Sequence, residues 1–419
     1  MIIGWRNQSG ESMDDKVKNT YAGDESEQGP LLSVIIAVYN AEPYLAEALD
    51  SLLVQGFRDM EILCVNDGST DKSGKILADY AARDPRIRIL DQENRGASAA
   101  RNTGTHAAKG KYLYYMDSDD LLEPGALGLV ITQMERNDLE YLCFNSVAFA
   151  ETPEGQIIAG QMNRDYLERE LEENRIYTGQ ALFRELKTNP KMDLIVPAWG
   201  CIITRDFILK HQILFVPGMI HEDEVWTFSV LMKVQRAGCL NRCLYYYRIH
   251  TDSQINGPVT LANAYNLYRC ILEIQKIFAA PDFLCEPGLE RILIRHTRGL
   301  QNRAIQKYLA CSQAEKEKRY QLSLEEQSRF ETLVVKPAAM KADLQRAKKQ
   351  ALAEKEKAAQ YMQQNKQYKQ YKQKNKLLKA SRDYRLGRTL LWLPRKIKRF
   401  LKAAASPGAA GSGGKGQAA

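Results

Sequence analysis

The sequence predicts an α/β protein, with a largely parallel sheet in its N-terminal half and an α-helical C-terminal region. Apolar runs of strand length alternate with amphipathic segments of helix length from Leu31 to Phe149, which is the pattern of βαβ units. Clusters of Asn, Asp, Gly and Ser follow several of these runs. Residues 325–380 are rich in Ala, Lys, Gln and Glu, a composition typical of a long solvated helix.

The expected strands of the first half are rich in apolar and aromatic residues, as buried strands are. They are 31–39, 61–65, 87–90, 112–116 and 141–149. Helices are expected between them because apolar or small side chains recur at helical spacing, as Leu45, Leu49 and Leu52 do. The expected helices are 42–53, 73–82, 97–108 and 125–136.

After Gly160 the pattern becomes irregular. We expect helices near 167–173 and 179–186, extended chain at 199–204 and 238–247, and helical chain through 259–312. No strict heptad persists over 325–380, so a coiled coil is not favoured. The predicted organisation is a loose leader (1–30), an α/β domain (31–255), a helical region (256–325), a long charged helix (326–380), a basic amphipathic helix (381–403) and a flexible tail (404–419).

Composition excludes several classes of protein. Hydrophobic residues make up 44% of the 419 residues, enough for a sizeable core, so wholesale disorder is excluded. The longest apolar run, 31–39, is too short to span a bilayer, and the first ten residues lack a signal-peptide core. The eight cysteines form no CxxC pair and are expected to be buried thiols in a reducing compartment. We therefore expect a cytoplasmic protein.

The formal net charge of +8 is unevenly distributed. Residues 341–402 contain twenty basic and four acidic residues, a net charge of +16, whereas residues 1–340 carry −9. The lysines around Tyr361, Tyr368 and Tyr371 could follow a polyanion. No nucleic-acid-binding fold accompanies them, so nucleic acid is not expected and an anionic glycan or lipid head group is favoured.

The segment 384–402 predicts a helix that lies in a membrane interface. Its apolar residues step by four, three, four and four along one helical face, and basic residues occupy the other. Pro394 is expected to kink or restart the helix. The alternative is a helix packed on the protein's own acidic body. The residues expected at an anionic inner membrane face are Leu390, Trp392, Arg395, Lys396, Lys398 and Arg399.

Three polar clusters follow predicted strands, at 39–40, 66–71 and 117–120. Ligands of open α/β sheets bind beyond the carboxyl ends of the strands, so together the clusters predict a site; each alone also fits a turn with a helix cap. Asp117 and Asp119 are separated by one residue and can converge on Mg²⁺ or Mn²⁺. A solvated acidic turn is the alternative.

A second acidic cluster, 221–224, precedes the apolar segment 225–231. It could hold a general base, although acidic residues are also favoured by the dipole at a helix N-terminus. His250 follows a run of tyrosines and, taken alone, fits a structural histidine as well as a ligand.

Four segments follow one another in the chain: SVIIAVYN (33–40), VNDGSTD (65–71), NRGASAARNTG (94–104) and YMDSDD (115–120). Together and in this order they resemble glycosyltransferase family 2, whose members are inverting, nucleotide-sugar-dependent enzymes of the GT-A fold, a Rossmann-like nucleotide-sugar-binding domain. The resemblance is dense over 31–125 and extends thinly to about 255. It is greatest to the bacterial branch that builds capsule, exopolysaccharide and wall-linked glycans.

The resemblance implies a nucleotide-binding role for five residues. Asp67 would accept the uracil N3–H, and Tyr39 and Asn40 would line the nucleoside pocket. Arg101 would lie near the nucleotide or its diphosphate, unless it forms a helix-surface ion pair. Asp117 would hold the ribose or share the metal ion.

The resemblance also implies the remaining roles. Asp119 would coordinate Mn²⁺ or Mg²⁺, and His250 matches a metal ligand of some relatives. Asp223 would be the catalytic base, with Glu222 as its neighbour. Trp199 would stack on the acceptor sugar, with a core tryptophan as the alternative. Many relatives have Lys where this chain has Cys201, which weakens inference about the acceptor.

We therefore expect a hexosyltransferase-type enzyme that moves a sugar, from a UDP-sugar by preference, to a glycan or lipid-linked glycan in cell-surface polysaccharide synthesis. A nucleotidyltransferase would need a Gly-rich basic loop after the first strand, which 39–42 is not. The other alternative is a catalytically silent binding module tethered by its basic tail. The intact Asp67, Asp117, Asp119 and Asp223 favour the enzyme.

Overall fold

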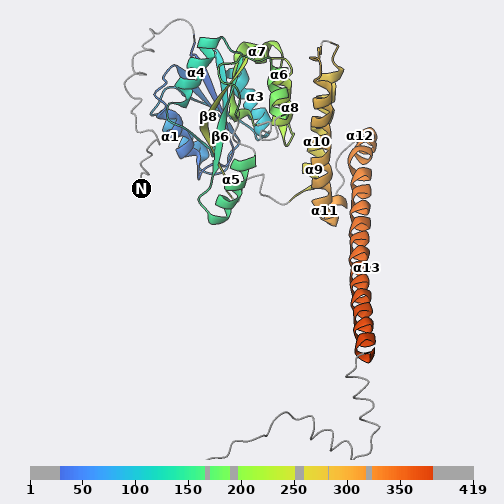
Figure 1. The fold of residues 1–419 in the computed structure, drawn as a ribbon. Helices are drawn as coiled ribbons and strands as arrows, with labels where there is room; N and C mark the ends of the chain where they lie inside the picture. The colour runs from blue at the N-terminus through green and yellow to red at the C-terminus, as the bar shows by residue number, and fades with distance from the viewer. Residues whose placement is uncertain are drawn as a thin grey trace, which may run out of the picture. The chain divides into compact units, whose positions relative to one another are not determined.

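The computed structural model describes residues 29–165, 170–188, 197–250, 259–281, 283–317 and 323–380 (Figure 1). Two compact units comprise residues 1–338 and 339–419. Most of the expected leader, the amphipathic helix with its six membrane-facing residues, and the tail lie outside the described residues. Within the described ranges, no helix combines the length and apolar character needed to cross a membrane.

The first unit is built on an eight-stranded sheet with the order β3-β2-β1-β4-β7-β6-β8-β5. Its first four strands are parallel, so their carboxyl ends lie at one edge. Val34 and Ile36 of β1 face one core while Ile35 faces the other, as the two-residue period of a strand dictates. The four strands are β1 (Leu32–Val38), β2 (Met60–Asp67), β3 (Ile87–Gln92) and β4 (Tyr112–Asp117).

The other half of the sheet is mixed. β7 (Cys201–Thr204) lies antiparallel between β4 and β6 (Tyr141–Phe149). β8 (Ala237–Arg248) runs parallel to β6, and β5 (Leu121–Leu122) pairs antiparallel with β8. The expected extended segment 199–204 begins as a single 3₁₀ turn, Ala198–Gly200. β5 was not predicted because two residues are too few to produce a periodic pattern.

Helices cover both faces of this sheet (Figure 1). One apolar core includes side chains of α1, α2 and α4, and the other includes those of α6, α7 and α8. α3 packs along β1 and β2. The bounds are α1 (Leu45–Leu53), α2 (Ser73–Ala81), α3 (Ala97–Ala107), α4 (Ala126–Asn137), α6 (Gly179–Thr188), α7 (Arg205–Lys210) and α8 (Glu222–Leu231). This mixed sheet between helical layers is the GT-A arrangement.

A helix was expected near 167–173, of which 167–169 lie outside the described residues; over 170–173 the expectation is wrong. The helix of this region is α5 (Pro153–Asp165), whereas the described residues 170–173 form coil and turn. Thr152 caps α5 through a hydrogen bond of 3.1 Å that its Oγ1 accepts from Gly155 N–H, and Pro153 suits the first helical position. Leu171 is instead held in coil by two hydrogen bonds with the Asn241 side chain.

The helical region begins with α9 (Leu261–Ala279) and α10 (Glu290–Ala310), which pack against each other. Their buried side chains belong to the same apolar core as those of α6 and α8. Phe330 contacts the rings of Tyr265, Tyr268 and Tyr308, which joins the next helix to this pair. The remaining helices are α11 (Gln313–Glu317), α12 (Leu324–Phe330), the π-turn Glu331–Val335 and the 45-residue α13 (Lys336–Ala380).

Candidate active site

Three carboxylates converge where β4 ends. Asp117, Asp119 and Asp120 each offer an oxygen, and these oxygens lie within 4.8 Å of one another. Asp120 is fully buried and accepts hydrogen bonds of 2.7 Å from the Tyr245 hydroxyl and from Arg248 N–H. Asp120 was given no role from the sequence, although it belongs to the same acidic motif.

The electrostatics of this cluster favour a bound cation. Burial raises the pKa of Asp119, and the neighbouring charge of Asp117 raises it further. Burial raises the pKa of Asp120 well above its usual value, with the charges of Asp119 and Asp117 adding to the effect. Carboxylates packed in this way repel one another unless a cation neutralises them. Their oxygens suit Mg²⁺ or Mn²⁺, so the residues present fit a divalent metal.

His250 lies beside the cluster. Its Nε2 is 2.9 Å from Oδ2 of Asp119, and its ring packs on that of Tyr44 with 4.8 Å between centroids. The structure therefore brings together Asp117, Asp119 and His250, to which the family resemblance had given one metal site.

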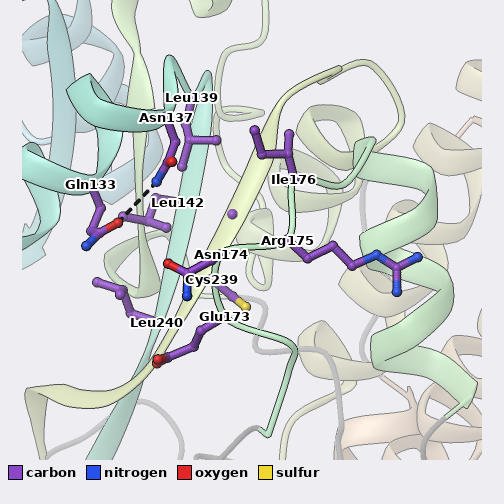
Figure 2. Close-up of a pocket in the computed structure, with 11 residues that line it drawn as sticks. Gln133, Asn137, Leu139, Leu142, Glu173, Asn174, Arg175, Ile176, Cys239 and Leu240 are labelled. Carbon is purple, nitrogen blue, oxygen red and sulfur yellow. Dashed lines mark hydrogen bonds between the residues drawn. The ribbon is translucent and has the colours of Figure 1, made fainter.

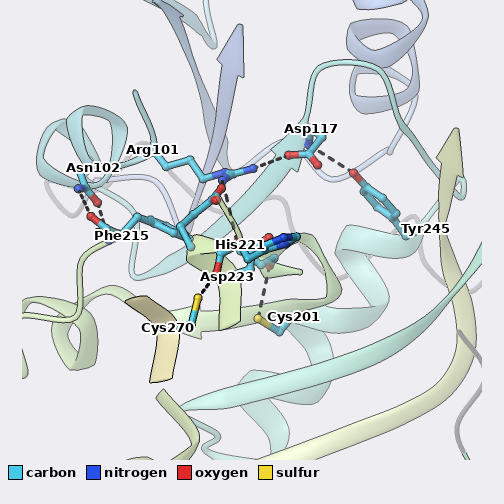
Figure 3. A network of polar contacts seen from close by, with 11 residues as sticks. Arg101, Asn102, Asp117, Cys201, Phe215, His221, Asp223, Tyr245 and Cys270 are labelled. Atoms are coloured by element: carbon cyan, nitrogen blue, oxygen red, sulfur yellow. Dashed lines mark hydrogen bonds and ion pairs between the residues drawn. The ribbon is translucent and has the colours of Figure 1, made fainter. Parts of the chain in front are cut away.

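Arg101, on α3, joins this cluster to the second acidic pair (Figure 3). Its guanidinium is 2.8 Å from Asp117 and 2.6 Å from Glu222, and 4.0 Å from Asp223. Only 7% of the residue is exposed, and the guanidinium lies over the Phe215 ring. The alternative of a helix-surface ion pair is therefore wrong, because Arg101 is buried among three carboxylates.

Glu222 and Asp223 begin α8. Burial raises the pKa of Asp223 well above its usual value, while the charge of Arg101 opposes this rise. A carboxylate with a raised pKa in a site lined by other charges, as Asp223 is, has the properties of a general base.

The residue that precedes this pair, His221, has a left-handed backbone with φ of 67°, which is uncommon for a residue with a side chain.

Asp67 lies at the carboxyl end of β2, and the family resemblance implied that it binds the nucleoside. Its buried carboxylate accepts hydrogen bonds from Gln92 Nε2 (2.6 Å), Arg95 N–H (2.9 Å) and Gly96 N–H (2.8 Å). Gly96 has a φ of 85° and precedes α3, so the Asp67 side chain fixes the start of that helix.

Tyr39 and Asn40 directly follow β1. Because β1 pairs in parallel with β2, they lie at the same edge of the sheet as Asp67. Tyr39 is half-exposed. Asn40 has a left-handed backbone with φ of 49°, and its Oδ1 accepts a 2.8 Å hydrogen bond from Thr70 N–H. The loops after β1 and β2 are thereby joined, and Tyr39 faces solvent beside them.

Trp199 does not present a ring face for a sugar. It is 4% exposed and stacks on Tyr245 with 4.3 Å between centroids and 6° between planes. Its packing matches the alternative of a core tryptophan, and the acceptor role expected for it is not retained. Cys201, in the next strand, is also buried and its Sγ lies 3.5 Å from Ala198 O.

A small cavity lies away from these residues (Figure 2). It is lined by the beginnings of β6 and β8, including Leu142 and Gly238, together with Asn137 and Arg175. Because β6 and β8 run in the same direction as β4, the beginnings of these strands lie at the sheet edge opposite Asp117. Its volume of about 50 Å³ is far below the roughly 300–1,000 Å³ of small-molecule sites.

Comparison with known proteins identifies the family. Residues 33–192 match the model of glycosyl transferase family 2. The chain is 34% identical to the uncharacterized glycosyltransferase EpsJ of Bacillus subtilis over 55% of this chain and 64% of that protein. It is 30% identical to glycosyltransferase GlyG of Streptococcus pneumoniae over 53% of this chain and 72% of that protein.

The chain thus spans less than two thirds of the length of EpsJ. Among solved structures, Staphylococcus aureus TarS (residues 1–349) in complex with UDP-GlcNAc is 18% identical with a TM-score of 0.49, over 72% of this chain and 79% of that one. The family model matches residues 33–192, GlyG is covered over 72% of its own length at 30% identity, and the chain belongs to glycosyltransferase family 2.

Proposed function

We propose that the chain is an inverting glycosyltransferase that moves one sugar from a nucleotide-sugar donor to a glycan or lipid-linked glycan acceptor in cell-surface polysaccharide synthesis. The observation that supports this most strongly is the arrangement around Arg101. It contacts Asp117, the last residue of β4, and Glu222, the first residue of α8, and these two residues are far apart in the sequence. A leaving-group site and a base site are therefore held next to each other.

The donor is proposed to be a UDP-sugar. A carboxylate offers about four acceptor positions, and Asp67 uses three of them within the protein. The remaining position on Oδ2 is available for the uracil N3–H, with Tyr39 covering the nucleoside. Asn40 would act by holding the loop at Thr70.

Asp119, with Asp117 and His250, would hold Mn²⁺ or Mg²⁺. When bound, the metal supplies positive charge that stabilises the departing diphosphate. Asp120 would support this site by fixing Tyr245 and the Arg248 backbone. The positive charge of Arg101 would offset the repulsion between the carboxylate of Asp117 and those of Glu222 and Asp223.

Asp223 would remove the proton from the acceptor hydroxyl. The hydroxyl oxygen then forms a bond to the anomeric carbon as the bond from that carbon to the phosphate oxygen breaks on the opposite face. The electron pair leaves with the nucleoside diphosphate, the proton resides on Asp223, and the anomeric configuration is inverted. Glu222 would assist by holding Arg101 at 2.6 Å.

A donor panel tests this proposal. Binding and slow hydrolysis of UDP-, GDP- and dTDP-sugars would be measured with Mn²⁺ and with EDTA. Metal-dependent turnover of one donor supports the transferase and identifies its sugar. Well-folded protein that binds no donor would contradict the proposal and favour a catalytically silent binding module.

A cytoplasmic, membrane-peripheral location is part of the proposal. Residues 381–419 contain the basic amphipathic segment, and each Lys or Arg near an anionic leaflet contributes about 1 kcal/mol. A lipid-linked acceptor would be reached from that surface. Removal of 381–419 is expected to release the protein from anionic liposomes while donor turnover persists. Unchanged binding to the liposomes would contradict the attachment.

A further inference from the structure

We propose that helices α9 and α10 position the candidate base, with Asn266 and Arg303 as positioning residues. The inference rests on the proposed function, since it assigns these helices to the step in which Asp223 acts. Both helices lie beyond residues 33–192, the part of the chain that matches the family model.

The segment to be held is the base loop, residues 216–221, which leads from Phe215 into α8. Its backbone is left-handed at Gly218 (φ 65°) and at His221 (φ 67°). A left-handed residue with a side chain persists only where its surroundings hold it. Because His221 directly precedes Glu222 and Asp223, the backbone angles of the base loop set where both carboxylates lie.

Three residues of α9 contact the backbone of the base loop. Asn266 Oδ1 accepts a hydrogen bond of 3.1 Å from Ile220 N–H. Arg269 donates one of 3.0 Å to the carbonyl of Gly218. The Cys270 thiol is 3.4 Å from the carbonyl of His221 (Figure 3). Since 266, 269 and 270 are spaced by three and four residues, these contacts come from one face of α9.

α10 contacts the start of α8 through a charge pair. Arg303 pairs with Glu224, whose side chain is only 5% exposed. A buried carboxylate without a cation is strongly disfavoured, so the pair fixes the first turn of α8 one residue after Asp223.

The other end of the base loop is held by α3. The side chain of Asn102 accepts a hydrogen bond of 2.9 Å from Phe215 N–H and donates one of 2.8 Å to Phe215 O. Arg101, its neighbour, contacts Glu222. The candidate base, Asp223, is therefore positioned from two sides, by α3 and by the helical pair α9 and α10.

Substitution of Arg303 tests the proposal in the full-length protein. In Arg303→Gln the uncompensated Glu224 would displace the first turn of α8, and misplacement by about 1 Å can lower a rate about 100-fold. We expect kcat for the donor selected by the panel to fall at least about tenfold, with the donor Kd in Mn²⁺ unchanged within a factor of about two. Arg303→Lys keeps the charge and should retain most of the activity.

Arg298→Gln is the matched control, because Arg298 is an exposed arginine on the same helix and takes part in none of the ion pairs found among the described residues. It should leave kcat unchanged. Loss of donor binding in parallel with kcat, an equal loss in Arg303→Lys, or an equal loss in Arg298→Gln would overturn the positioning role.

Amide hydrogen exchange supplies a test that needs no turnover. Asn266→Ala should accelerate exchange at Ile220, and Arg303→Gln should accelerate it at Glu224, relative to wild type. Unchanged exchange in both variants would overturn the proposal. If the wild-type protein turns over no donor, the proposed function fails, whereas the exchange data still decide whether these helices hold the base loop.

Discussion

Replacing Arg101 by methionine would test whether the acidic groups of the site depend on this one buried cation. The substitution keeps an apolar stem over the Phe215 ring but removes the hydrogen bonds to Asp117 and Glu222 and the 4.0 Å contact with Asp223. Breaking a buried ion pair costs about 3–5 kcal/mol. The Asp117 side chain is 31% exposed and regains some hydration, so we expect a loss of about 3 kcal/mol in the free energy of unfolding at pH 7.

The loss should depend on pH in a defined direction. Burial already raises the pKa of Asp223, and Arg101 opposes that rise, so the pKa rises further in the variant. A carboxyl whose folded pKa exceeds its unfolded value stabilises the fold when protonated and loses that contribution as pH rises through the folded pKa. The difference between variant and wild type should therefore shrink as pH falls from 7 toward 5.

Urea denaturation at pH 7 and pH 5, in EDTA, would measure both effects. Lys111→Met is the matched control, since Lys111 forms a 2.7 Å pair with Glu135 in which both side chains are substantially exposed. Such a surface pair contributes about 0–1 kcal/mol. A loss below about 1 kcal/mol in Arg101→Met, or a loss that does not change with pH, would refute the reasoning.

Four further substitutions, at three residues, and one pH profile test individual residues. Asp223→Asn should lower kcat by about 10²–10⁴-fold with the donor Kd unchanged, and calorimetry showing weaker donor binding would contradict the base assignment. Asp119→Asn should make donor affinity the same in Mn²⁺ as in EDTA; a persisting metal effect would exclude Asp119 as a ligand. Trp199→Phe should leave activity intact while Trp199→Ala lowers stability by about 3–5 kcal/mol, and a selective rise in acceptor KM in the phenylalanine variant would instead restore the acceptor role. The pKa of Asp223 is raised, and only its carboxylate form accepts a proton. As pH decreases, the transfer rate should therefore begin to fall at a higher pH than the usual pKa of a carboxyl group would give. A rate that stays constant down to pH 5 would contradict the assignment of Asp223 as the base.

The parts of the fold that the sequence predicted are those with local signals. Strands such as 141–149 and helices such as 97–108 follow from apolar periodicity and turn residues, and the observed bounds of β6 and α3 agree within one residue. α5 was missed because its start depends on Thr152 and Pro153 rather than on an apolar stripe.

The contacts between distant parts of the chain could not be predicted from local patterns. Arg101 and Glu222 are separated by 121 residues, so nothing in the neighbourhood of either identifies the other. Trp199 illustrates the same difficulty, because its ring is buried by packing against Tyr245 and Tyr247, which are distant in the sequence. The acidic motif indicated Asp117 and Asp119 as candidate site residues. It could not indicate the role of Asp120, because that side chain is held by Tyr245 and Arg248 of β8, which are distant in the sequence.

The strand order has a consequence for how the chain acquires its structure during synthesis. β6 pairs with β7 and β8 rather than with β4, although it follows β4 and β5 in the sequence. The four parallel strands β1–β4 can assemble once residue 117 has left the ribosome, but β4 then has an open edge until β7, at Cys201–Thr204, is made. An unpaired edge of this kind is a template for pairing with other chains. Nascent chains that end between 117 and 201 are therefore expected to be the aggregation-prone intermediates, and the ones that most need a chaperone.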